Sequence, residues 1–236
     1  MKKILAGILF LMVVCFGANA DAVSWNIIND DFDSLSGWGN RNLGSGVAEI
    51  NPPGYLHLDS TEVGNNNAGA IQQWTIIPNN YVIGVRTYFQ SLGTGGDTSY
   101  TIGIANTPIM LFIALQSNGL YIYRQSNPTE VGNDIVLLQQ WQDWQFDVRA
   151  PNLNEAQLDV YLNGNLIQSN IPCGSDWVNV NGFAYLGQYS YLTHTESYTD
   201  YFRLGVNNPV PEPSTMLLLG SGLIGLLGFG KRLIKS

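Results

Sequence analysis

Apolar and polar residues alternate along much of this chain, with the two-residue period of β-strands that bury one face. The alternation is clearest over residues 81–89, 144–149 and 158–162. Further strands are predicted at 54–58, 70–75, 99–104, 109–116, 120–125, 182–186 and 198–204. Residues 21–208 show no convincing helical period. The pattern therefore predicts an all-β domain.

Turn-forming residues separate the predicted strands. Asn163-Gly164 follows one strand, Asn118-Gly119 divides 109–116 from 120–125, and residues 92–97 are rich in glycine. The chain contains 26 glycines, and only 12% of its residues are charged. Many short strands joined by such turns indicate an antiparallel β-sandwich. Roughly 190 residues are enough for one hydrophobic core.

Strand parity assigns a face to each side chain. The residues predicted to face the core are Ile83, Val85, Phe146, Val148, Val160, Leu162, Phe202 and Leu204. Those predicted to face outward are Arg86, Tyr88, Asp147, Arg149, Asp159, Tyr161, Tyr201 and Arg203.

The outward set has the chemistry of a sugar-binding surface, because aromatic rings stack on the C–H faces of sugars while planar polar groups bond to the hydroxyls. The candidate glycan-binding residues are Arg86, Tyr88, Asp147, Arg149, Tyr161 and Tyr201. The alternative is that these residues make ordinary cross-strand pairs, for example Arg149 with Asp159.

The start of the chain has the pattern of a signal peptide. Lys2 and Lys3 precede an apolar stretch over residues 4–17, and Ala18-Asn19-Ala20 offers a site for signal peptidase. Residues 1–20 are therefore predicted to be a signal helix that is removed, so that the mature chain begins at Asp21.

The end of the chain has three parts. Val210-Pro211-Glu212-Pro213-Ser214 leads into the apolar segment 216–230, which Lys231 and Arg232 close. This tail resembles the PEP-CTERM sorting signal of exported proteins of Gram-negative bacteria. The resemblance implies that residues 209–236 are a sorting signal, and that a membrane protease of the exosortase type recognises it and releases the protein near Pro211, Glu212 and Pro213.

The predicted transmembrane helix of this tail is short. Its fifteen residues, 216–230, reach roughly 22 Å as a helix, against a hydrocarbon core of ~30 Å. Five of them are glycines, which weaken the helix and allow close approach of another one. Both features suit handling by a membrane partner, and a plain tail anchor is the alternative.

Basic residues at both ends mark the cytoplasmic side of the membrane. Residues 21–208 are then predicted to lie across the inner membrane, anchored through the C-terminal segment. After processing, the protein is expected in the periplasm, at the cell surface or outside the cell.

The domain between the two end segments is acidic. Residues 21–208 contain five arginines, seventeen acidic residues and no lysine, a formal charge of −12. Nucleic acid is excluded as a partner because it needs a basic surface, and the membrane is contacted only through the C-terminal segment. Cys173 is the one cysteine of this region, so we predict a small buried side chain and no intramolecular disulfide.

Four segments of the domain carry a family resemblance. They are Asp30 to Asp33 with Gly37-Trp38, the Trp141-to-Val148 strand, the Leu158-to-Gly164 hairpin and the closing Tyr198-to-Leu204 strand. Together they resemble the concanavalin A-like lectin/glucanase, or laminin-G-like, group over residues 30–204, which implies a jelly-roll sandwich. A galactose-binding-like sandwich is the alternative fold.

The sequence lacks three common catalytic patterns of hydrolases. Retaining glucanases of the resembled group carry Glu-x-Asp-x-x-Glu on one strand, which places the two working carboxylates on the same face. The nearest acidic pairs here, Glu155/Asp159, Glu130/Asp134 and Glu196/Asp200, have a different spacing. No His-Glu-x-x-His or Gly-x-Ser-x-Gly pattern occurs. His57, between Leu56 and Leu58, is expected to be structural, and the protein is predicted not to be an enzyme.

A calcium site is a further hypothesis. Oxygen ligands gather at Asp30, Asp31 and Asp33, and Asp200 in the last strand is expected near the first. Asp30, Asp31 and Asp200 are therefore the candidate calcium ligands, with a second oxygen-rich run over residues 59–66. A solvated acidic loop without metal is the alternative, and no other cofactor is expected.

Together these observations predict an exported, surface or matrix-associated protein that is not an enzyme and binds a polysaccharide. Two alternatives stay open: a glycoside hydrolase or lyase of the concanavalin A-like group, and a purely structural matrix protein.

Overall fold

The computed structural model describes residues 22–40, 45–61, 68–73, 79–92, 100–106, 109–124, 127–150, 152, 154–174, 182–188 and 195–208. Within these ranges every helix or strand position is a strand, and no helix is present that could span a membrane. The predicted signal helix, the sorting signal and its transmembrane helix lie outside them. The chain divides into two compact units, of which Trp25–Val206 holds the sandwich.

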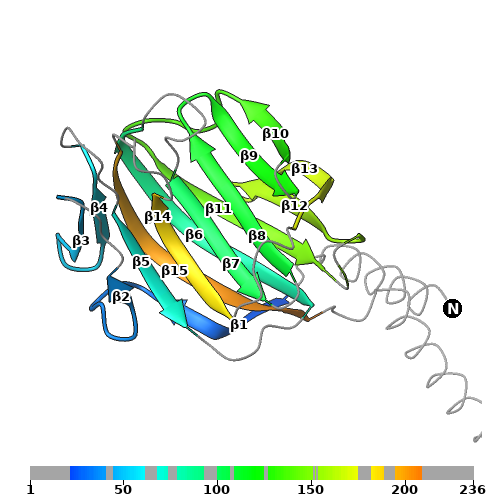
Figure 1. The fold of residues 1–236 in the computed structure, drawn as a ribbon, viewed down its shortest axis with the longest axis horizontal. Coiled ribbons are helices and arrows are strands. Elements are labelled where there is room, and N and C mark those ends of the chain that lie inside the picture. The colour runs from blue at the N-terminus through cyan, green and yellow to red at the C-terminus, as the bar shows by residue number, and fades with distance from the viewer. Residues whose placement is uncertain are drawn as a thin grey trace, which may run out of the picture. The chain divides into compact units, whose positions relative to one another are not determined.

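Two antiparallel sheets make up the domain, as Figure 1 shows. Sheet A has the order β13 (Asn165–Pro172), β12 (Gln157–Leu162), β11 (Trp141–Arg149), β6 (Asn80–Ser91), β15 (Glu196–Asn208), β4 (Leu56–Asp59), β3 (Val47–Ile50), with β1 (Ala22–Asp30) also paired to β15. Sheet B has the order β10 (Asn127–Asn133), β9 (Gly119–Arg124), β8 (Ile109–Gln116), β7 (Tyr100–Asn106), β14 (Phe183–Gln188), β5 (Gly69–Gln73), β2 (Gly39–Asn40). The predicted all-β antiparallel sandwich is confirmed.

The core lies between the two sheets and contains the residues that the alternation of apolar and polar positions predicted to face inward. Strand β11 shows the rule most clearly, because Trp144, Phe146 and Val148 are buried while the residues between them are half-buried. Of the eight residues predicted to face inward, seven are buried, and Leu162 is partly buried and packs against the core. Burial of aromatic and branched side chains supplies the main stabilisation of such a sandwich.

Two smaller predictions are also confirmed. Asn163 and Gly164 both have positive φ, at 49° and 76°, as a type I′ turn between β12 and β13 requires. Cys173 is buried, and burial raises the pKa of its thiol to about 12, so it is an inert filler of the core.

Candidate functional site

Aromatic side chains form a row across the outer face of sheet A. His57 of β4 lies opposite Tyr198 of β15, Tyr198 lies opposite Tyr88 of β6, and Tyr88 lies opposite Trp141 of β11. Tyr55, just before β4, makes a tilted ring contact with Trp141. We call these five residues the aromatic row. Because neighbouring strands are in register, side chains far apart in sequence become direct neighbours.

The rings of the aromatic row are in continuous contact. His57 and Tyr198 stack with centroids 4.6 Å apart, and Tyr198 meets Tyr88 edge-on at 6.1 Å. Trp141 lies 5.4 Å from Tyr88 and 5.3 Å from Tyr55. All five side chains are half-buried, so they keep part of their ring surface open to solvent. The row is a preformed surface of the kind that apolar ring faces of a ligand can cover.

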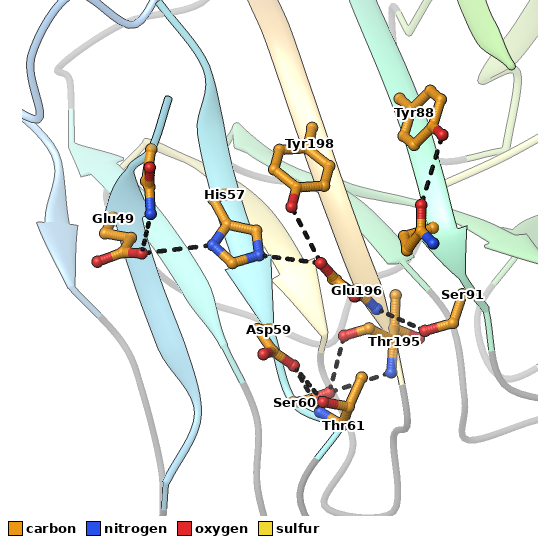
Figure 2. A network of polar contacts seen from close by, with 12 residues as sticks. Glu49, His57, Asp59, Ser60, Thr61, Tyr88, Ser91, Thr195, Glu196 and Tyr198 are labelled. Carbon is orange, nitrogen blue, oxygen red and sulfur yellow. Dashed lines mark hydrogen bonds and ion pairs between the residues drawn. The ribbon is translucent and has the colours of Figure 1, made fainter. Parts of the chain in front are cut away.

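One end of the row is acidic. Figure 2 shows His57 between two carboxylates: its Nδ1 lies 3.5 Å from Glu49 Oε1 and its Nε2 lies 3.6 Å from Glu196 Oε1. Asn51 Nδ2 donates to Glu49 at 3.0 Å, and the Tyr198 hydroxyl donates to Glu196 at 3.0 Å. Glu49 has 47% of its side chain exposed and Glu196 27%, so both carboxylates can reach a ligand.

Hydrogen bonds fix the charges at this end. Donation from Asn51 and then from His57 lowers the pKa of Glu49 below its ordinary value, so it is ionised at neutral pH. The pKa of Tyr198 is raised to about 12, first by desolvation and then by its bond to Glu196. The Tyr198 hydroxyl therefore stays protonated at neutral pH and acts as a hydrogen-bond donor.

The other end of the row carries an arginine. The Arg86 guanidinium lies 5.3 Å from the Trp141 ring centroid, Nη1 donates to Asp200 at 3.0 Å, and Nε is 3.7 Å from Asp143 Oδ1. The Tyr201 hydroxyl donates to the same Asp143 oxygen at 3.0 Å. Burial, followed by the neighbouring Asp143 charge, raises the pKa of Tyr201 to about 12. This end is an ordered network of paired charges.

Arg149 and Asp159 form a separate group on β11 and β12. Nη1 and Nη2 of Arg149 donate to the two Asp159 oxygens at 2.8 and 3.0 Å, and Nη2 reaches Asn170 Oδ1 at 3.2 Å. The Asn170 backbone N–H donates to Asp159 at 2.7 Å. The predicted cross-strand pair is thus confirmed, and its polar atoms are already engaged.

The predicted glycan-binding residues fall into these two groups. Arg86, Tyr88 and Tyr201 lie on β6 and β15 at or beside the aromatic row. Asp147, Arg149 and Tyr161 lie on β11 and β12, where Asp147 also accepts from Gln145 Nε2 at 2.8 Å. Whether these residues bind a glycan stays a prediction.

Sequence reasoning missed several residues of the row itself. They are Tyr55, His57, Trp141 and Tyr198, and Glu49 beside the row was missed as well. The sequence could have indicated two of them. Trp141 is an even number of residues from Asp143 and Asp147 and so lies on the same face of the strand, and Tyr198 begins the predicted strand 198–204.

The three candidate calcium ligands are engaged in separate interactions. Asp30 accepts from the Phe32 backbone N–H at 2.7 Å and from Trp38 Nε1 at 2.6 Å. Asp31 pairs with Arg203 at 3.1 Å, and Asp200 pairs with Arg86. Over the described ranges no three acidic, histidine or cysteine side chains converge to hold a metal ion. The calcium hypothesis gains no support from this geometry, and most of its second run, residues 62–66, lies outside these ranges.

The outer face of sheet B has a different character. Ala105, Met110 and Phe112 form a buried apolar cluster there, against which Tyr123 and Phe183 pack. Strands β8 and β7, the third and fourth of the seven strands of this sheet, contain no acidic residue. Sheet A is therefore the face with the chemistry of a polar ligand site.

Comparison with known proteins identifies the tail and the fold. Residues 209–232 match the PEP-CTERM protein-sorting motif, and no curated protein matches the sequence. A carbohydrate esterase from the Shiga toxin-encoding bacteriophage phi24B is similar in structure, with 12% identity and a TM-score of 0.57 over 79% of this chain and 100% of that one. A structure from work on endo-acting O-glycanases that initiate mucin breakdown, from human gut bacteria, has 12% identity and a TM-score of 0.54 over the same shares.

An endo-β-1,4-glucuronan lyase from the fungus Trichoderma reesei is also similar, with 16% identity and a TM-score of 0.50 over 76% of this chain and 95% of that one. At these identities the likeness establishes the fold alone, and it agrees with the expected concanavalin A-like domain. The chain is thus an exported protein with an all-β sandwich of the jelly-roll type, followed in the sequence by a PEP-CTERM protein-sorting motif at residues 209–232.

Proposed function

We propose that this protein binds a glycan at the cell surface or in the extracellular matrix, without turning it over. The observation that carries the proposal is the aromatic row, five rings in mutual contact across neighbouring strands of sheet A. A rigid, half-exposed aromatic surface offers binding area at a low cost in conformational entropy.

The surroundings of the row suit a sugar. Pyranose rings present C–H faces that stack on aromatic side chains, while their hydroxyls require donors and acceptors at the ring edges. Arg86 at one end is a donor, and Glu49 and Glu196 at the other end are acceptors. A few fixed polar groups around an apolar surface are the usual composition of a small-molecule site.

Two further observations support a carbohydrate ligand. The sorting motif implies export, which delivers the domain to the compartment where polysaccharides accumulate. The structurally similar proteins include a carbohydrate esterase, a structure from work on O-glycanases, and a glucuronan lyase.

A glycoside hydrolase or lyase is the second candidate. The placement of Glu49 and Glu196 on either side of His57 favours it, because a histidine between carboxylates can move a proton. Against it stands Tyr198, whose hydroxyl is kept protonated at neutral pH by its raised pKa and so cannot accept a proton there. A purely structural matrix protein, the third candidate, would need no ligand surface.

A glycan-array screen tests the proposal. The full chain, purified in mild detergent, is applied with calcium and then with chelator, while the solution is monitored for released sugar. Binding without release supports the proposal, and loss of binding with chelator would add a metal. Release of sugar would establish the enzyme, and a folded chain that binds no glycan would overturn the proposal in favour of a structural protein.

A further inference from the structure

The carboxylates at the β3–β4–β15 end of the aromatic row have no arginine partner. Glu49, Asp59 and Glu196, which we call the acidic end, sit on three adjacent strands, with Asp59 opposite Glu196. Among the described residues no arginine lies within ion-pair distance of any of them, and His57 is the one ionisable base that contacts Glu49 and Glu196. By contrast, Asp143 and Asp200 at the far end share Arg86.

Carboxylates that have no arginine partner in the described part of the chain, and that lie beside half-exposed rings, have a definite preference in ligand charge. A cation gains both from the carboxylates and from the negative faces of the aromatic rings. An anionic sugar would face repulsion at the acidic end, and the guanidinium at the other end is already paired. The site chemistry therefore favours a cationic ligand over a neutral or anionic one.

We propose that the aromatic row binds a polysaccharide bearing protonated amino groups, such as a partly de-N-acetylated hexosamine polymer. This inference rests on the proposed glycan-binding function and specifies its ligand class. Sugar rings stack on Trp141, Tyr88 and Tyr198, and an ammonium group of the polymer contacts the carboxylates of Glu49 and Glu196 from the solvent side of His57.

The dimensions of the row suit a polymer rather than a single sugar. The aromatic row crosses three inter-strand spacings of about 4.8 Å, from β4 to β11, and Glu49 on β3 adds a fourth, so the row and the acidic end together are about 19 Å long. The polymer runs across the strands, and the difference between the acidic end and the Arg86 end gives it a direction. The formal charge of −12 over residues 21–208, with no lysine, adds long-range attraction for a polycation.

A titration series tests the ligand class. The full chain in mild detergent is titrated at mildly acidic pH with hexamers of glucosamine, N-acetylglucosamine and glucose, at low and high salt. We expect the glucosamine hexamer to bind about tenfold or more tightly than the other two, since each hydrogen bond to a charged group contributes about that factor. Salt should reduce this preference.

A charge-matched pair of double variants locates the effect. Glu49→Gln/Glu196→Gln should remove the preference for the amino sugar. Glu130→Gln/Glu155→Gln, which removes the same charge from exposed positions outside the row, should retain it. Thermal unfolding confirms that both variants are folded.

The outcomes separate this inference from the function on which it rests. Equal affinity for the acetylated and free amino sugars would overturn the amine preference while leaving glycan binding in place. Equal losses in the two double variants would show a general charge effect and also overturn the site. No binding to any of the three hexamers would count against the amino-sugar ligand, and the glycan array then decides the broader proposal.

Discussion

Trp141 is the residue on which the proposed binding surface depends most. Its indole contacts Tyr55, Tyr88 and Arg86 on the outer face of sheet A. We expect Trp141→Ala to weaken binding of a glycan identified on the array by about tenfold or more, because large aromatic anchors dominate interface energies. The unfolding free energy should fall by less than about 2 kcal/mol, since the ring is half-buried. Titration and urea denaturation measure the two effects.

Tyr121 provides a matched aromatic control for this experiment. It is half-buried on β9 of sheet B, where its hydroxyl accepts from Asn118 at 2.9 Å. Tyr121→Ala should leave glycan affinity unchanged. If both variants lose affinity equally, or if Trp141→Ala binds as the unmodified protein does, the aromatic row is not the binding surface.

The Arg149–Asp159 pair makes a prediction about acid stability. The hydrogen bond from Arg149 lowers the pKa of Asp159 below its ordinary value of 3.8, burial opposes the shift, and the Asn170 N–H adds to it. A folded-state pKa below the unfolded one means that the ionised form stabilises the fold above the unfolded pKa. That stabilisation is lost as the pH falls through the folded-state pKa.

Asp159→Asn should therefore lower the unfolding free energy by about 1 kcal/mol near neutral pH, a modest value because Arg149 is partly exposed. The deficit should begin to shrink as the pH falls below the ordinary aspartate pKa of 3.8, and it should vanish below the lowered folded-state pKa, where Asp159 of the unmodified protein is protonated. Urea midpoints at neutral and acidic pH check this, and a deficit independent of pH would show that packing, not charge, is lost.

A hydrogen bond links strand β7 of sheet B to strand β15 of sheet A. The Tyr100 hydroxyl and Thr199 Oγ1 lie 2.8 Å apart in the buried space between the sheets. Burial raises the pKa of Tyr100, so its hydroxyl stays protonated in the native state. Tyr100→Phe leaves the Thr199 hydroxyl without this partner and should cost about 1–2 kcal/mol of unfolding free energy.

Adding Thr199→Val should cost less in the Tyr100→Phe background than in the unmodified protein, because an apolar pair leaves no unsatisfied group. A double-mutant cycle on urea denaturation measures this coupling. A coupling energy of zero would mean that the two hydroxyls stabilise the sandwich independently of one another.

Strands with a clear alternation of apolar and polar residues were predictable from sequence, whereas five strands, β1, β2, β3, β10 and β13, were missed. All ten predicted segments correspond to strands of the two sheets, for example 158–162 to β12. Strand β13 was missed because six consecutive residues, Asn165–Asn170, are exposed at the edge of sheet A and leave no alternation. Strand β10, at the edge of sheet B, contains Pro128 and Gly132, which weaken a strand pattern.

The candidate site was only partly predictable, for a different reason. The two-residue alternation correctly predicted that Arg86, Tyr88 and Tyr201 face outward. It does not predict which strands are neighbours in the sheet. His57 meets Tyr198 only because β4 pairs with β15, and Trp141 meets Tyr88 only because β11 pairs with β6. Partner choice depends on the packing of the whole sandwich, so contacts between strands remote in sequence required the structure.

At the scale of the whole molecule, the sorting motif and the proposed glycan-binding surface lie in different parts of the chain. The sorting motif occupies residues 209–232, whereas the aromatic row lies within the compact unit Trp25–Val206. Changes to the motif should therefore alter the location of the protein and leave the sandwich and its ligand affinity intact. Changes to the row should do the reverse.

Replacing Pro211, Glu212 and Pro213 together by alanine tests this separation. The sorting motif implies processing by an exosortase, so the variant should stay in the membrane fraction of a host that carries this protease, while the unmodified chain is released. Trp141→Ala serves as the control, because it should be released normally and bind glycan weakly. Immunoblots of membrane and medium, with glycan titration of the retained variant, measure both properties.

Normal release of the triple variant would show that these three residues are not the recognised element. Lost glycan affinity in the retained but folded variant would show that the ligand site depends on the tail.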